Sequence, residues 1–161
     1  MKNINIHVTK EDLTKCCGSE KWVNKMVSNS PFYSKDELFG VSNKIWNSLN
    51  KEDWLEAFSY HPKIGDINSL KEKFFSTKHL AENEQSGVNE ASIHCLTELA
   101  KYNEDYEKKF GYIFIVCASG KSADEMLDLI KQRINNNPED EIKIAIEEQN
   151  KITKLRLEKF I

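Results

Sequence analysis

The sequence lacks the features that mark several large classes of protein. No apolar run approaches the roughly 18 residues that a membrane-spanning helix needs, and no charged and then apolar leader opens the chain. The formal net charge is only -3, and the basic residues near the end alternate with apolar ones as on a solvated helix face. The chain ends in Phe160-Ile161 rather than in a serine-lysine-leucine address for peroxisomes. These absences predict a cytoplasmic protein that binds neither membranes nor nucleic acids.

Metal and redox motifs are also missing. The cysteines are Cys16, Cys17, Cys95 and Cys117, and no two of them have the spacing of a zinc or thioredoxin-like motif. We expect all four to be reduced and mostly buried, as in a cytosolic protein. The histidines form no His-Glu-x-x-His motif and no pair at the four-residue helical spacing. We therefore predict no catalytic metal.

What the chain does contain is a series of helix signals. Ser34 with Glu37, and Ser122 with Glu125, have the spacing of a capping box, and Asn137-Pro138 is a typical helix start. Apolar residues recur at helical spacing over 9–18, 21–28, 34–49, 50–58, 69–79, 88–109, 122–134 and 137–160. With 161 residues and no repeat, linker or low-complexity tract, we predict one all-α domain over 1–161. Residues 1–8 are expected to form a loose N-terminal arm.

One apolar segment, Phe110 to Ala118, has an ambiguous pattern. It is short and rich in β-branched and aromatic residues, so periodicity does not distinguish a strand from a buried helical turn. Because nothing else in the chain has the pattern of a strand, a strand here would lack a partner. We expect buried extended or helical chain within an all-α protein.

The least ordinary stretch is Tyr60-His61-Pro62-Lys63-Ile64-Gly65-Asp66, which follows a helix predicted to end near Phe58. Pro62 disfavours a helical conformation at His61 and stiffens the backbone behind it. An imidazole with a pKa near ~6.5 gains or loses a proton at neutral pH. This pattern is compatible with an acid/base group, with a metal ligand, and with a turn histidine that only caps a helix.

Three further regions carry candidate site residues. Glu84 is a carboxylate that can tune His61, and Gln85 offers both a donor and an acceptor. Either side chain could instead complement the start of the following helix. Arg156 shares a helix face with Ala145, Gln149 and Ile152, so it either covers that face with its stem or grips a carboxylate. The small residues after Val116 leave backbone groups accessible to a ligand.

These stretches together resemble a known family. The motifs are His61-Pro62-Lys63-Ile64-Gly65-Asp66, Glu84-Gln85-Ser86-Gly87, the run from Phe110 to Ala118, and Lys151-Ile152-Thr153-Lys154-Leu155-Arg156-Leu157. In this order they resemble the 2-oxo-4-hydroxy-4-carboxy-5-ureidoimidazoline (OHCU) decarboxylase family, the third enzyme on the route from urate to allantoin. The resemblance extends from about residue 9 to about residue 160.

The resemblance implies an all-α, cofactor-free homodimer that converts OHCU to (S)-allantoin, in functional coupling to urate oxidase and hydroxyisourate hydrolase. It implies that His61 and Glu84 are catalytic. It places substrate-binding groups at Pro62, Gln85, Val116, Cys117, Ala118, Ser119, Gly120 and Arg156. The alternatives are a non-catalytic all-α module that binds a ureide or a protein partner and, less favoured, a metal-dependent amidohydrolase. Retention of both His61 and Glu84 favours the decarboxylase, because binding alone needs no such pair.

Overall fold

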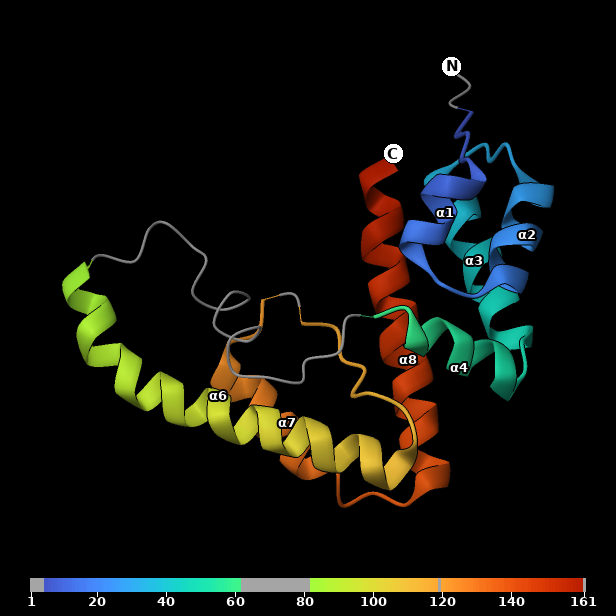
Figure 1. Ribbon diagram of the computed structural model, residues 1–161. Coiled ribbons are helices and arrows are strands. Elements are labelled where there is room, and N and C mark those ends of the chain that lie inside the picture. Colours follow the sequence, from blue (N-terminus) through green and yellow to red (C-terminus); the bar gives the residue numbers. More distant parts are fainter. Residues whose placement is uncertain (1–4, 62–81, 119, 161) are drawn as a thin grey trace. The chain divides into compact units, whose positions relative to one another are not determined.

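The computed structural model describes residues 5–61, 82–118 and 120–160, with only the backbone described for 82–92. Helices account for most of these residues, which confirms the prediction of an all-α protein. They are α1 (Lys10–Cys16), α2 (Glu20–Asn29), α3 (Lys35–Ser48), α4 (Lys51–Ser59), α6 (Glu82–Phe110), α7 (Ala123–Arg133), α8 (Pro138–Leu157) and the short 3₁₀ helix η1 (Glu158–Phe160) (Figure 1). The helix expected over 69–79 lies outside the described residues.

The chain divides into two compact units. Unit 1 comprises Met1–His61, Ile115–Cys117 and Lys143–Ile161, and unit 2 comprises Pro62–Phe114 and Ala118–Ile142. The helix α8 therefore begins in unit 2 and continues through unit 1. The prediction of a single domain stays a prediction.

Most helix starts follow the expected local chemistry. The side chains of Thr9, Ser34, Asn50 and Ser122 each accept a hydrogen bond from a backbone N–H three residues later. Such a bond satisfies one of the N–H groups that a helix leaves unpaired in its first turn. The long helix α6 begins at Glu82, so residues 82–87, which are compatible with a loop or a first helical turn by sequence, belong to the helix.

Unit 1 is a helical cluster with an aromatic core. Figure 1 shows α1, α2 and α3 beside the later turns of α8. The Trp46 indole donates to the carbonyl of Ile146 on α8 at 3.0 Å. Ile6 forms an isolated bridge with Phe32, so the arm expected over 1–8 is held against this unit at Ile6. The largest fully buried side chains of unit 1 are Trp22, Trp46, Phe32, Phe58, Leu13, Met26, Leu38 and Ile115.

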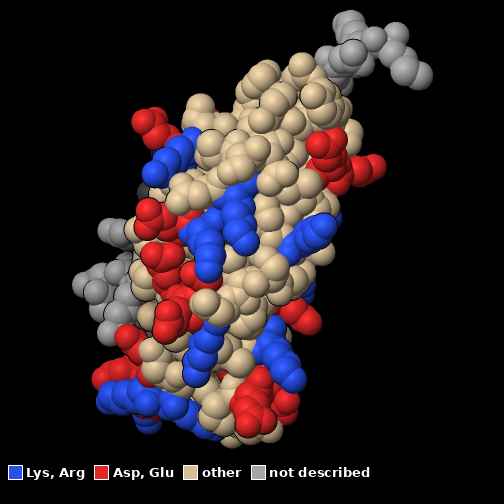
Figure 2. Space-filling model, turned by 90° about the vertical axis from the view of Figure 1, so that its right-hand side faces the viewer, with Lys and Arg blue, Asp and Glu red and all other residues tan. Residues whose placement is uncertain are grey.

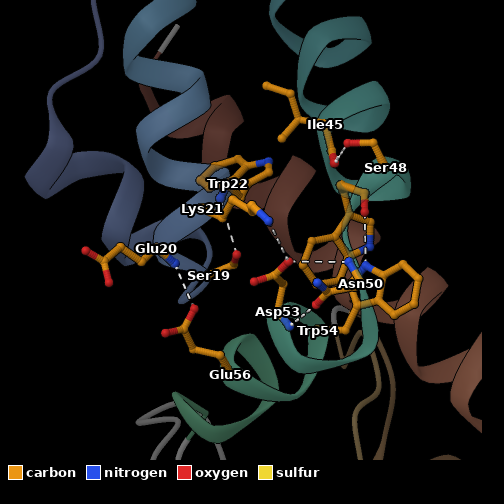
Figure 3. A network of polar contacts seen from close by, with 11 residues as sticks. Ser19, Glu20, Lys21, Trp22, Ile45, Ser48, Asn50, Asp53, Trp54 and Glu56 are labelled. Carbon is orange, nitrogen blue, oxygen red and sulfur yellow. Dashed lines mark hydrogen bonds and ion pairs between the residues drawn. The ribbon is translucent and has the colours of Figure 1, made fainter.

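A polar network fixes α4 beside α2 (Figure 3). The Glu20 backbone N–H donates to Glu56 Oε1 at 2.9 Å, and Lys21 Nζ lies 3.8 Å from Asp53 Oδ2. Asn50 and Asp53 complete a reciprocal capping box at the start of α4. Individually, exposed contacts of this kind contribute little to stability. Together they hold α4 against the start of α2.

Gly18 provides a testable constraint at the end of α4. A Cβ atom built on Gly18 would lie 2.4 Å from Cγ and 2.6 Å from Cβ of Tyr60, the residue that follows α4. These atoms belong to the root of the side chain, so rotation alone does not relieve the clash. We expect Gly18→Ala to lower the free energy of unfolding by about 1–3 kcal/mol, measured by urea denaturation.

Gly40 supplies the matched control for this substitution. It lies inside α3 and a Cβ there meets nothing within 4 Å. Gly40→Ala is expected to raise stability by about 0.5–1 kcal/mol, because alanine is the better helix former. A loss of stability at Gly40 equal to that at Gly18 would contradict the close packing of Gly18 against Tyr60.

Unit 2 has α6 packed along α7, with a buried ion pair at the start of α8. Arg133 donates to Glu141 Oε2 from Nε at 2.9 Å and from Nη2 at 2.6 Å. The Tyr106 hydroxyl donates to the same oxygen, and Asn136 Nδ2 donates to Glu141 Oε1 at 3.1 Å. The Arg133 guanidinium also lies over the Phe114 ring, 4.5 Å from its centroid. The buried carboxylate is thus fully surrounded by donors.

Within the described residues, the ambiguous segment forms neither a helix nor a strand from 113 to 118. Gly111 has a φ of +84°, which favours glycine and ends α6 sharply. Phe114, Ile115 and Cys117 are buried after it. The segment was expected to be buried extended or helical chain, and after Phe110 it is largely buried and not helical.

Positive and negative side chains are interspersed on the face of the molecule in Figure 2. On the face drawn in Figure 2, basic and acidic side chains lie next to one another rather than in separate patches. Across the described residues, no helix combines the length and hydrophobicity needed to cross a bilayer.

Candidate active site

The site begins at His61, where α4 ends. The helix closes at Ser59, and the His61 backbone N–H donates to the Phe58 carbonyl at 3.2 Å. The imidazole is half-buried, and its backbone is fixed by this turn. The prediction that His61 directly follows a helix end is confirmed, whereas Pro62 lies outside the described residues.

The imidazole meets α8. His61 Nε2 is hydrogen-bonded to Oε1 of Gln149, a side chain with no exposed surface. The other end of the same amide, Gln149 Nε2, donates to Thr153 Oγ1 at 3.1 Å. The Thr153 hydroxyl in turn donates to the main-chain carbonyl of Gln149 at 3.0 Å. A buried polar chain therefore connects the candidate acid/base group to the C-terminal helix.

The same face of α8 contacts the end of α1. Arg156 Nη1 donates to the Lys15 carbonyl at 3.3 Å, where the carbonyl groups at the helix end favour a cation. Thr153 lies close enough to the Cys17 thiol to lower its pKa, against the larger rise caused by burial. Arg156 is half-buried, which is compatible both with a stem that covers this face and with a guanidinium that binds a carboxylate.

Two buried thiols lie at this junction. Burial raises the pKa of Cys16 from the ordinary 9.0 to about 11, an effect that the Arg156 charge opposes. Burial likewise raises the pKa of Cys17 to about 12. Because the thiolate is the reactive form, both groups are inert near neutral pH. All four cysteines are buried and none forms a disulfide, as the sequence predicted.

We expect alkylation at pH 8 to label Cys16 and Cys17 at least about 100-fold more slowly in native protein than in urea, given the two-unit rise in pKa. Since folding raises these pKa values, the associated stability is complete below pH 9 and declines as the pH rises toward about 11 and 12. Peptide mass spectrometry would measure the labelling at each site. Equal rates in native and unfolded protein would contradict the burial of these thiols.

At the end of the apolar run, some of the backbone groups expected to bind substrate already have hydrogen-bond partners within the protein. The Cys117 N–H donates to Glu148 Oε1 at 3.2 Å, and Glu148 Oε2 pairs with Lys151 Nζ at 2.7 Å. The Ala118 carbonyl accepts from the Lys121 N–H at 3.0 Å. These two backbone groups therefore have partners within the protein, whereas the small side chains predicted groups that are accessible to a ligand. Gly120 is exposed with a φ of +73°, and Ser119 lies outside the described residues.

Sequence reasoning and structure identify different partners for His61. Glu84 and Gln85 lie in the first turns of α6, and their side chains are outside the described residues, so the His61–Glu84 pair stays a prediction. Gln149 and Thr153 were not predicted as partners of His61. The sequence signal that could have identified Gln149 was its position as an amide on the part-apolar helix face that also carries Arg156. Among the described residues, no three His, Cys, Asp or Glu side chains gather as metal ligands.

Comparison with known proteins gives a consistent picture. A uric acid degradation bifunctional protein (TTL) from Arabidopsis thaliana is 37% identical over 96% of this chain, which spans 48% of that protein's length. An OHCU decarboxylase from Amia calva is 27% identical over 83% of this chain and 76% of its own. A crystal structure of OHCU decarboxylase in the presence of (S)-allantoin is 40% identical, with a TM-score of 0.74 over 94% of this chain and 97% of that one.

The family assignment rests on nearly the whole sequence rather than on one motif. The model of the OHCU decarboxylase family matches residues 5–158, which include α1, His61 and the length of α8. The solved relative likewise matches 94% of this chain. This chain belongs to the OHCU decarboxylase family.

Proposed function

We propose that this chain catalyses the cofactor-independent decarboxylation of OHCU to (S)-allantoin. The observation that carries the proposal is the match to a solved OHCU decarboxylase, 40% identical over 94% of the chain. A half-buried histidine held at a helix end supplies the acid/base group that this chemistry uses. The activity is a lyase reaction of urate degradation, with a small ureido-imidazoline as substrate.

The substrate carries its own electron sink. A ring carbon bears both a carboxylate and a hydroxyl, next to a C=N bond. When the bond to the carboxylate breaks, carbon dioxide leaves and its electron pair forms a C=C bond, while the C=N pair moves to nitrogen, which takes a proton. The hydroxyl then loses a proton to become a carbonyl, and the carbon that bears the ureido group gains one. The net change is loss of carbon dioxide and uptake of one proton by the carboxylate form.

These proton movements define the proposed roles. We propose that His61 takes the hydroxyl proton or delivers a proton to carbon, with Glu84 supporting its charge. Delivery from one face yields one enantiomer. The ureido group and the ring amides would be held by Pro62, Gln85 and the backbone around Val116–Gly120. The Cys117 N–H and the Ala118 carbonyl would have to exchange their present partners for the substrate, or other backbone groups would bind it. Arg156 would bind the substrate carboxylate through its planar fork.

The experiment that separates this proposal from a ureide-binding module is carbon dioxide release. OHCU would be made freshly from urate with urate oxidase and hydroxyisourate hydrolase, and carbon dioxide followed with and without this protein. Release above the spontaneous rate supports the decarboxylase. Release at the spontaneous rate by folded protein, together with calorimetric binding of allantoin, would move the assignment to the non-catalytic module.

We also propose a homodimer in the cytoplasm, functionally coupled to the two upstream enzymes. The four cysteines form no disulfide, which supports a reducing compartment. Light scattering is expected to give twice the chain mass of 18.7 kDa. A mass of 18.7 kDa at micromolar concentration would contradict the dimer.

A further inference from the structure

The amide of Gln149 is the most completely buried polar group next to the proposed acid/base residue. Its side chain has no exposed surface, and Thr153 is only 2% exposed. Buried donors and acceptors must be paired within the protein, because an unmet one costs about 1–3 kcal/mol. The way in which this amide is oriented therefore follows from its partners.

Thr153 determines which end of the amide faces the imidazole. Its hydroxyl hydrogen is directed to the Gln149 main-chain carbonyl at 3.0 Å, a bond that threonine commonly makes within a helix. The Thr153 oxygen is then an acceptor, and Gln149 Nε2 donates to it at 3.1 Å. Turning the amide by 180° would place its oxygen against Thr153 and draw the hydroxyl away from the main chain. The arrangement in the structure satisfies both groups and leaves Gln149 Oε1 toward His61.

An amide oxygen only accepts hydrogen bonds, so its partner on the ring must carry a hydrogen. We infer that Gln149 and Thr153 are positioning residues that keep His61 protonated at Nε2, so that the proton exchanged with the substrate is carried at Nδ1. The inference deepens the proposed function, since it rests on His61 as the acid/base group. Fixing one nitrogen as a permanent donor decides which nitrogen can change its protonation state, as well as the ring's orientation.

The spacing along α8 explains how the helix performs this task. Gln149 and Thr153 are four residues apart, so their side chains lie one turn apart on the same face of the helix. Thr153 can therefore hold the amide without help from another element. Gln149 reaches His61 from 88 positions away in sequence, so α8 acts as the rigid support for the residue at the end of α4.

The test is the tautomer of His61, read from the ¹⁵N NMR spectrum of the full chain labelled in its histidines. The signals of His61 are identified by their loss in His61→Ala. At a pH where the ring is neutral, we expect Nε2 to carry the hydrogen in the wild-type protein. Thr153→Val removes the hydroxyl at nearly constant volume and is expected to give a mixture of tautomers. Thr153→Ser keeps the hydroxyl and is expected to restore the Nε2–H form.

Activity provides a second readout. Gln149→Met removes the acceptor with a side chain of similar length and is expected to lower kcat about 10–100-fold with little change in KM. Gln132→Met is the control, because Gln132 is exposed on α7. Thr153→Ser should keep a kcat close to that of the wild type, whereas Thr153→Val should not.

The outcomes separate this inference from the proposed function. A hydrogen on Nδ1 in the wild type, or an unchanged tautomer in Thr153→Val, would overturn the inference even if the enzyme is fully active. If the protein releases no carbon dioxide, the proposed function fails, and the NMR result still decides the tautomer. Should Gln149→Met fail to fold, the Thr153→Val and Thr153→Ser pair gives the answer alone.

Discussion

Replacing His61 with alanine is expected to lower kcat/KM for OHCU by about 10²–10⁴-fold, the usual contribution of a positioned acid/base group. The methyl group that remains can neither accept the hydroxyl proton nor deliver one to carbon. Steady-state decay of freshly made substrate, corrected for its spontaneous loss, measures the effect. Carbon dioxide release on the same samples confirms that the decay is decarboxylation.

The fold of this variant must be checked because His61 also contacts Gln149. Its loss leaves a buried amide oxygen without that partner, and we expect a cost of about 1–3 kcal/mol in stability. His94→Ala is the matched control, since the His94 side chain is 79% exposed and its Nε2 meets only the surface carboxylate of Glu98, at 3.8 Å, among the contacts of the described residues. Near-wild-type kcat/KM in folded His61→Ala would exclude His61 as the acid/base group.

The second large effect is expected in unit 2, where Glu141→Gln should lower the free energy of unfolding by about 3–5 kcal/mol. The substitution keeps the shape of the side chain but removes the charge that balances buried Arg133, whose side chain is 8% exposed. The carboxamide also presents two hydrogens to a site that is filled with donors, among them Asn136 Nδ2 at 3.1 Å. Urea denaturation followed by far-ultraviolet circular dichroism measures the loss.

Glu104→Gln is the matched control for the buried pair. Glu104 lies 3.2 Å from Lys108 one turn along α6, and the two side chains are 62% and 71% exposed. Solvent screens this pair, so its removal should cost less than about 0.5 kcal/mol. Similar losses for Glu104→Gln and Glu141→Gln would contradict the burial of the Arg133–Glu141 pair.

The same experiment tests the prediction of a single domain. The three tryptophans, Trp22, Trp46 and Trp54, all lie in unit 1, whereas Glu141 lies in unit 2. If the chain unfolds as one cooperative domain, Glu141→Gln shifts the fluorescence and dichroism midpoints together. A shift in dichroism alone would identify two independently unfolding units.

Local signals in the sequence predicted most helix starts correctly. Caps such as Thr9, Asn50 and Ser122 act on backbone groups three residues away, so short-range spacing is sufficient to identify them. The clear helical pattern begins only at Val88, because residues 81–87 are small and polar and are compatible with a loop or with the first turn of a helix. In the structure α6 already begins at Glu82, and Gly87 within it costs about 1 kcal/mol locally.

Pairings between distant residues could not be predicted in the same way. Glu141 has the pattern of an ordinary first-turn acid, and only the folded arrangement shows that it is buried against Arg133 and Tyr106. His61 and Gln149 likewise meet only because α4 and α8 pack within unit 1. The rigid turn in the sequence identified His61 as a candidate. The residue that orients its ring could be identified only from the tertiary structure.

The most direct test of the proposed activity is the handedness of the product. OHCU would be generated from urate with the two upstream enzymes, and circular dichroism followed as the substrate disappears, with and without this protein. We predict faster loss of substrate and the growth of a single-signed signal of (S)-allantoin, since protonation is delivered from one face. Loss at the spontaneous rate with racemic allantoin, from protein shown to be folded, would contradict the assignment of this chain as a decarboxylase.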